Sequence, residues 1–212
     1  MRQLESGYQV ISQQDRRHAG HALLKLRLTG NFTLFVIHHS LPMQALFNLF
    51  LDICLFRKGP QHVPFSATLL KLCLLAYGLS GLIVLVLSTP VPVALLQILL
   101  DLVLLSGLLY LALTLYRHPR RFEQTLSALT GAGALIGLLA LPLMSWIVHQ
   151  QPGGDIQLPS LLLLALMVWS IAIMAHILRY AFETSVWIGA LYALGYTFLS
   201  WTLTGWIGPD AS

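Results

Sequence analysis

The stretch PVALLQILLDLVLLSGLLYLALTLY, residues 92–116, decides the fold class of this chain. It is strongly apolar, and Asp101 is its only charged residue. An α-helix rises about 1.5 Å per residue, so roughly 20 apolar residues cross the 30 Å hydrocarbon core of a bilayer. The stretch therefore predicts a transmembrane helix, because a helix satisfies its own backbone polar groups where lipid offers no partner.

Other stretches of similar length and apolar composition lie on both sides of this one. They are residues 68–88, 125–148, 159–180 and 185–207. None of them alternates between apolar and polar residues in ten-residue segments, as the strands of a membrane barrel would. We therefore expect an all-α, polytopic membrane protein with a bundle of five transmembrane helices.

The composition supports this fold class. Of the 212 residues, 57% are hydrophobic and 9% are charged, whereas soluble domains are about one quarter charged. These values exclude an ordinary soluble enzyme and a disordered chain. The two cysteines, Cys54 and Cys73, form no disulfide framework and match no zinc or redox motif. We expect neither a metal ion nor a cofactor.

The positive charges predict the orientation of the bundle. With five spans, all 12 Lys and Arg residues fall on one side of the membrane, so the net charge of +4 reports topology rather than a nucleic-acid partner. The positive-inside rule then places the N-terminus in the cytoplasm and the C-terminus outside. We expect a bacterial inner membrane, or an organelle membrane of equivalent topology. An aromatic belt is expected at the outer boundary: Trp146, Trp201 and Trp206.

The segment ahead of the first span has two parts. Residues 1–40 are polar, lack the apolar core of a signal peptide, and are expected to form a cytoplasmic segment that is a hairpin or poorly ordered. Residues 41–58 predict an amphipathic helix that is too short to span a membrane. Its narrow polar stripe recurs every four residues: Gln44, Asn48 and Asp52. We expect this helix to lie in the membrane interface, and the alternative is a helix buried beneath the bundle.

Asp101 is the only carboxylate deep within a span, and a charge near the bilayer midplane is a functional candidate. Side chains at the same depth of other spans would be able to reach it by hydrogen bonds: Tyr77, Ser80, Trp169, Ser170 and Tyr196. The functional interpretation is a proton or cation relay. The structural interpretation is a carboxyl group that holds helices together, and the sequence favours it because a transporter usually needs more than one midplane charge.

The basic residues form a candidate contact surface for anionic lipid head groups or a membrane protein partner. They are Arg57, Lys58, Arg117, Arg120, Arg121 and Arg179. His176 and Glu183 share one helix face with Arg179, and this set predicts an interfacial salt-bridge cluster rather than a metal site. Small residues four apart mark close helix contacts, within the chain or in a homo-oligomer: Gly133 with Gly137, and Gly189 with Ala193.

Two further motifs point to a family. The amphipathic helix ends in Lys-Gly-Pro ahead of the first span, in FLDICLFRKGP, residues 50–60. The third span, TLSALTGAGALIGLLALPL at residues 125–143, is a small-residue helix that ends in proline. With five spans in the stated orientation, residues 41–207 resemble the Ypt-interacting protein (Yip) family in its bacterial form. Alanine, at Ala132 or Ala134, stands where that family has a tyrosine after the glycine.

The resemblance implies a non-enzymatic membrane scaffold or accessory protein, since eukaryotic Yip proteins bind membrane-associated GTPases in vesicle traffic. No catalytic residue carries over from the family. The alternative function is a small transporter or channel with Asp101 as an intramembrane proton- or cation-coupling group. A membrane-embedded enzyme is disfavoured, because no nucleophile or pair of acids stands at one depth and no nucleotide-binding loop is present.

Overall fold

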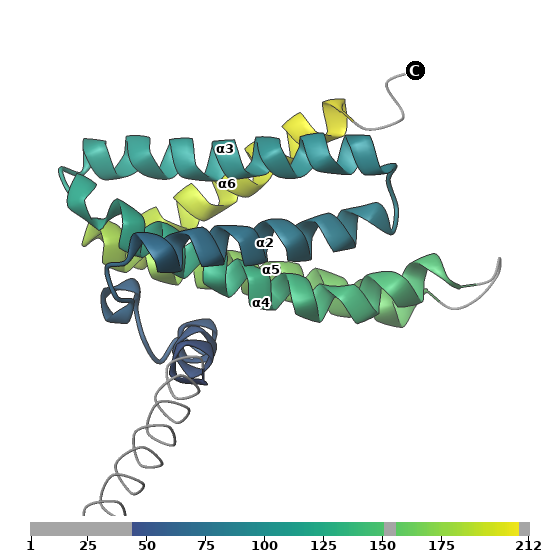
Figure 1. The fold of residues 1–212 in the computed structure, drawn as a ribbon, viewed down its shortest axis with the longest axis horizontal. Helices are drawn as coiled ribbons and strands as arrows, with labels where there is room; N and C mark the ends of the chain where they lie inside the picture. The colour runs from purple at the N-terminus through teal and green to yellow at the C-terminus, as the bar shows by residue number, and fades with distance from the viewer. Residues whose placement is uncertain (1–43, 151–155, 208–212) are drawn as a thin grey trace, which may run out of the picture. The chain divides into compact units, whose positions relative to one another are not determined.

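The computed structural model describes residues 44–150 and 156–207, and within these ranges it contains helices and no β-strand. The segment predicted as residues 1–40 lies outside the described residues. Five long helices make up the bundle: α2 (Ala67–Val86), α3 (Val91–Leu115), α4 (Phe122–Val148), α5 (Gln157–Phe182) and α6 (Val186–Trp206) (Figure 1). Each is long and apolar enough to cross a membrane. The predicted all-α fold with five spans is therefore confirmed.

The predicted bounds differ from the helices by a few residues. The clearest difference is at α4, which begins at Phe122 rather than at residue 125. Glu123 and Gln124 lower the hydropathy of this turn without breaking the helix, and the short helix η2 (Pro119–Arg121) leads directly into it. Hydropathy therefore marks the apolar part of a helix and misses a polar first turn.

A shorter apolar helix, Gln44–Cys54, precedes the bundle. It ends in a Schellman turn, in which Phe56 adopts a left-handed φ of 60° and the Arg57 N–H donates to the Asp52 carbonyl at 2.8 Å. The predicted amphipathic helix extended to residue 58, so its C-terminal end was placed too late. The turn leads through the short helix η1 (Pro60–His62) to α2.

The end of this short helix packs against the bundle along one face. Its buried side chains are Phe50, Ile53 and Cys54. The Phe50 ring lies against Gly131 of α4, and the Trp169 indole of α5 donates to the Cys54 carbonyl at 3.1 Å. Burial raises the pKa of the Cys54 thiol to about 11. Leu51 and Leu55 remain exposed, so the helix combines a buried face with an apolar outer one. Its place at the membrane interface stays a prediction.

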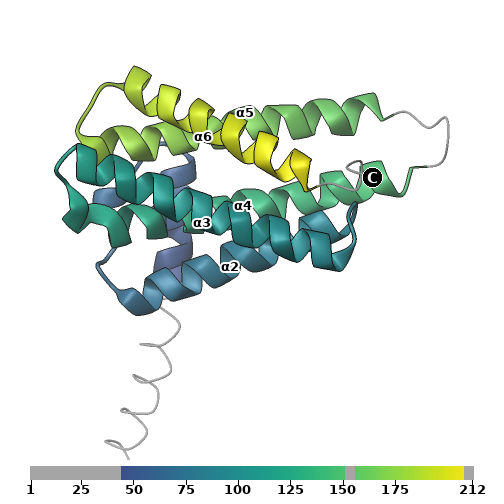
Figure 2. The ribbon, with the colours of Figure 1, turned by 90° about the horizontal axis from the view of Figure 1, so that it is seen from above.

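The two ends of the bundle differ in charge. One end, which we call the basic end, carries the connections at residues 55–66, 116–121 and 183–185 (Figures 1 and 2). Every Lys and Arg among the described residues lies in these connections or in the neighbouring helix turns: Arg57, Lys58, Lys71, Arg117, Arg120, Arg121 and Arg179. The opposite end, which we call the far end, carries the α2–α3 connection and the last turns of α4 and α6, with Trp146 and Trp206.

The helices do not pack evenly around the bundle. α2 packs chiefly on α4, α6 packs chiefly on α5, and α4 and α5 pack against each other, whereas α3 has smaller interfaces with its neighbours. α4 is buried almost without a break from Gln124 to Ala134 and has no buried residue after that point. The basic-end half of the bundle is therefore the tightly packed half.

Candidate functional site

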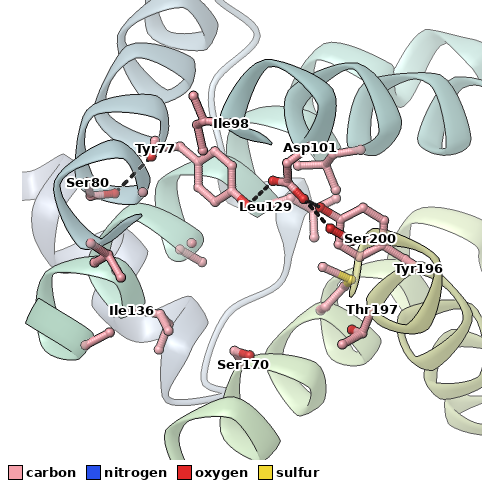
Figure 3. Close-up of a pocket in the computed structure, with 18 of the residues that line it drawn as sticks. Tyr77, Ser80, Ile98, Asp101, Leu129, Ile136, Ser170, Tyr196, Thr197 and Ser200 are labelled. Atoms are coloured by element: carbon pink, nitrogen blue, oxygen red, sulfur yellow. Dashed lines mark hydrogen bonds between the residues drawn. The ribbon is translucent and has the colours of Figure 1, made fainter. Parts of the chain in front are cut away.

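Asp101 of α3 accepts hydrogen bonds from two neighbouring helices. The Tyr77 hydroxyl of α2 donates to Oδ2 at 2.6 Å. From α6, the Tyr196 hydroxyl donates to Oδ1 at 2.6 Å and the Ser200 hydroxyl donates to the same oxygen at 2.8 Å (Figure 3). The carboxyl group therefore joins α2, α3 and α6 in the interior of the bundle, where apolar surroundings strengthen each bond.

Two of the partners expected from depth reach Asp101, and three do not. Tyr77 and Tyr196 bind it. Ser80 donates instead to the Tyr77 carbonyl at 3.0 Å, and Ser170 donates to the Met167 carbonyl at 2.7 Å. A serine hydroxyl within a helix readily bonds a carbonyl of the preceding turn, which explains both corrections. Trp169 binds the short N-terminal helix rather than Asp101.

Ser200 and Gln97 are site residues that the sequence analysis missed. Ser200 follows Tyr196 by four positions on α6, and Gln97 precedes Asp101 by four positions on α3. Residues four apart lie on one face of a helix. A search for polar pairs at this spacing within the apolar spans would have found both.

A cavity of about 540 Å³ lies beside Asp101 and is lined by all five long helices (Figure 3). Its lining extends to Thr89 in the α2–α3 connection and to Thr204 in the last turn of α6. Both residues belong to the far end, so the cavity reaches that end, and its lining also includes Leu129 and Ile177 in the basic-end halves of α4 and α5. Ser80 and Ser170 line it as well. Its volume lies within the roughly 300–1,000 Å³ that is typical of small-molecule sites.

Gln97 lines this cavity and carries a buried acceptor without a partner in the described chain. Its side chain is 7% exposed, and its Nε2 donates to the Thr204 carbonyl at 3.2 Å. Because that carbonyl is only an acceptor, the amide must present its nitrogen there and its oxygen on the other side. Within the described chain, Gln97 Oε1 is buried and has no hydrogen-bond partner. A buried acceptor without a partner costs about 1–3 kcal/mol, so it requires an explanation.

The small residues singled out in the sequence form close contacts within this chain. A Cβ atom on Gly133 would lie 2.6 Å from the Tyr77 ring, and one on Gly137 would lie 2.9 Å from Ser80 Oγ. α4 therefore makes room for the α2 side chain that binds Asp101. On α6, a Cβ on Gly189 would lie 2.5 Å from the Ala175 carbonyl oxygen of α5, and Ala193 is fully buried.

The salt-bridge cluster predicted on α5 is wrong in its pairing. Glu183 adopts a left-handed φ of 53° just after the helix and pairs with Arg121 of η2 at 2.5 Å and with His118 at 3.7 Å. Arg179 instead lies over the Tyr180 ring, 4.5 Å from its centroid. His176 Nε2 lies 3.3 Å from the Lys58 carbonyl. The helix ends before Glu183, which is why the helical face predicted from spacing does not continue to it.

Apart from Arg179, which lies on the Tyr180 ring, three members of the basic surface have no ion-pair partner among the described residues: Arg57, Arg117 and Arg120. All three are exposed. Lys58 pairs with Asp52 at 2.9 Å, and Arg121 is held by Glu183. The basic end therefore offers free guanidinium groups to its surroundings.

Within the described residues, this is an integral membrane protein with five long helices and a mostly apolar cavity that reaches an interior carboxyl group. No protein-family model matches the sequence, and no curated protein or solved structure matches it. A fold alone does not define a function, so the function has to be argued from the geometry of the site.

Proposed function

We propose that this protein is a small membrane transporter or channel in which Asp101 is the proton- or cation-coupling group. The single observation that carries the proposal is the cavity that runs from Asp101 to the far end of the bundle. A carboxyl group that only held helices together would need hydrogen-bond donors but no open volume beside it. The spans of the described chain supply no second charge at this depth, but Gln97, a neutral polar residue, lines the same cavity and carries an unpartnered oxygen.

The distribution of charge supports an orientation for this function. The basic end carries the Lys and Arg residues of the described chain, so by the positive-inside rule it would face the cytoplasm. The cavity would then open to the outside of a bacterial inner membrane and present Asp101 to cations arriving there. The C-terminal end of α6 and the α2–α3 connection would form its rim.

Flux in liposomes tests the proposal. The full-length chain is reconstituted into vesicles that hold a pH-sensitive dye, and proton or potassium gradients are applied. We expect Asp101→Asn to lower the flux by about tenfold or more, because the amide loses the charge that the cation requires. Ser106→Ala is the matched control on the same helix, since the Ser106 hydroxyl bonds only the carbonyls of the preceding turn.

Folding of both variants is checked by thermal unfolding in detergent. Wild-type flux in a folded Asp101→Asn variant would make Asp101 a structural residue and overturn the transporter proposal. An equal fall in flux in the Ser106→Ala variant would mean that substitutions in α3 disturb the folded protein in general.

A second candidate is the Yip-like scaffold, which the unpaired arginines of the basic end favour. Arg117 and Arg120 are exposed and without ion-pair partners among the described residues, as a surface for anionic lipid or a membrane protein partner requires. Crosslinking in native membranes followed by mass spectrometry tests this candidate. We expect a reproducible partner that is lost in Arg117→Glu/Arg120→Glu and retained in Ser106→Ala. A partner pattern unchanged by the charge reversal would remove this surface from consideration.

A further inference from the structure

We infer that the ligand of the Asp101 cavity is an organic ammonium ion with N–H groups and an apolar tail. The inference rests on the proposed function, because it names the substrate class of the same site. It is built from three features of the cavity: its charge, the two acceptors on α3 and the apolar wall.

The charge of the cavity selects a cation. Asp101 is its only acidic residue, and no Lys, Arg or His of the described chain lines it. An anionic ligand would face an uncompensated carboxylate in apolar surroundings, whereas a cation would be attracted to it. The Lys and Arg residues of the described chain lie at the basic end, so they do not neutralise this charge by contact.

Two acceptors stand one helix turn apart on the same face of α3. Within the described chain, Asp101 Oδ1 accepts two hydrogen bonds and Oδ2 accepts one, and Gln97 Oε1 accepts none. A primary ammonium group carries three N–H donors and is able to serve both residues once the Gln97 side chain turns its buried oxygen toward the cavity. A bare divalent ion would need about six or more oxygen ligands. The hydroxyl groups of Tyr77, Tyr196 and Ser200 donate to Asp101. Counting their oxygen lone pairs, the site still offers only neutral oxygens besides the one carboxylate.

The apolar lining of the rest of the cavity is suited to a hydrocarbon tail on the ligand. Ile98, Leu129 and Ile136 line it (Figure 3), as do Ile171 and Ile177. Its volume of about 540 Å³ far exceeds that of an ammonium group or a few water molecules, each of which takes about 30 Å³. An amphiphilic amine would place its head between Asp101 and Gln97 and its tail against this wall.

The test uses the full-length chain in lipid nanodiscs and three probes of equal chain length. Hexylammonium has the charge and the N–H donors, hexyltrimethylammonium has the charge alone, and 1-hexanol has neither the charge nor the N–H donors. Binding is measured as the saturable rise in thermal unfolding midpoint with probe concentration. We expect hexylammonium to bind about tenfold more tightly than hexyltrimethylammonium, because it replaces the missing hydrogen bonds. Saturable binding of 1-hexanol is not expected.

Two variants assign the binding to the named acceptors. Gln97→Leu is expected to weaken the binding of hexylammonium about tenfold. The unliganded variant is expected to unfold at the same temperature as the wild type or higher, because a buried unpartnered oxygen is removed. Asp101→Asn is expected to weaken the binding of hexylammonium about a hundredfold. Ser106→Ala should bind hexylammonium as the wild type does. Equal binding of 1-hexanol and hexylammonium, or wild-type binding by both Gln97→Leu and Asp101→Asn, would overturn the inference.

The outcome is separable from that of the flux experiment. Asp101-dependent proton or potassium flux without saturable hexylammonium binding would leave the transporter proposal standing and overturn this inference. Hexylammonium binding that depends on Asp101 and Gln97, without any flux, would keep the ligand site and overturn transport. Absence of both would overturn both.

Discussion

The two halves of the bundle are built from the same five helices but are packed by different means. In the basic-end half, α4 is buried from Gln124 to Ala134, and this segment is rich in Ser, Ala, Thr and Gly. In the far half, α4 has no buried residue after Ala134, and the helices surround a cavity. Lipid tails are as apolar as leucine, so membrane helices associate through close contact of small residues and not by excluding lipid.

The comparison teaches where a membrane bundle is able to hold a ligand. Where small residues bring the backbones together, little volume remains. Where the helices leave a cavity, polar groups such as Asp101 and Gln97 provide the specific contacts. Substitutions in one half of the bundle, with matched substitutions elsewhere as controls, test this difference.

The largest effect is expected from overfilling the tight half. Ala128 of α4 is fully buried, and Ala128→Leu adds three carbon atoms where no space exists. We expect the free energy of unfolding to fall by about 3 kcal/mol. Thermal or SDS-induced unfolding in detergent measures the change.

Ala140 is the matched position on the same helix in the far half, because it lines the cavity. Ala140→Leu should change the free energy of unfolding by less than about 1 kcal/mol, since the cavity accepts the added atoms. Equal destabilisation by the two substitutions would contradict the distinction between the halves.

A smaller loss is expected from separating α5 and α6. In Gly189→Ala the new Cβ would meet the backbone of Ala175 and lie 3.1 Å from the Arg179 nitrogen, and neither atom is able to rotate away. We expect a loss of about 2 kcal/mol in the free energy of unfolding.

Gly195 of the same helix provides the control. Nothing lies within 4 Å of a Cβ built there, so Gly195→Ala should be neutral or stabilising by up to about 1 kcal/mol through helix propensity. Chemical denaturation of the two variants side by side checks the pair. If Gly189→Ala is as stable as Gly195→Ala, the α5–α6 contact is not close.

The smallest effect is expected at the end of α3. Arg117 has a left-handed φ of 62° and closes a Schellman turn, with the His118 N–H donating to the Leu113 carbonyl at 2.8 Å. A residue with a Cβ in this conformation costs about 1 kcal/mol that glycine avoids. Arg117→Gly should therefore stabilise the protein by about 1 kcal/mol, which a raised unfolding midpoint would show. A lowered midpoint would mean that the arginine side chain makes a stabilising contact.

Much of the fold follows from the sequence because the bilayer imposes a simple requirement on length and polarity. Each span needs enough apolar residues to cross the hydrocarbon, and all five spans met that requirement. The helix ends were less predictable, because they depend on local turns. Phe56, Arg117 and Glu183 each take the left-handed position that glycine would mark in a sequence. The residue types at these positions therefore do not predict that the helix ends there.

The site was partly predictable for a related reason. Depth along the spans identified Asp101 and its two tyrosine donors, since groups at one depth have the opportunity to meet. Depth does not tell which way a side chain faces, and Ser80 and Ser170 bond their own helices instead. The cavity, and with it the role of Gln97, depends on how far the helices separate. That separation is a property of the packed bundle and not of any single span.

The burial of the two cysteines makes the chain suitable for chemical mapping. Cys54 and Cys73 are the only thiols of the sequence, and both are buried. With a pKa of about 11, Cys54 has very little of the reactive thiolate at neutral pH. The unaltered sequence therefore serves as a low-background parent for single-cysteine labelling. A cysteine introduced at the basic end and another at the far end would report, with a membrane-impermeant maleimide, which end faces the cell exterior.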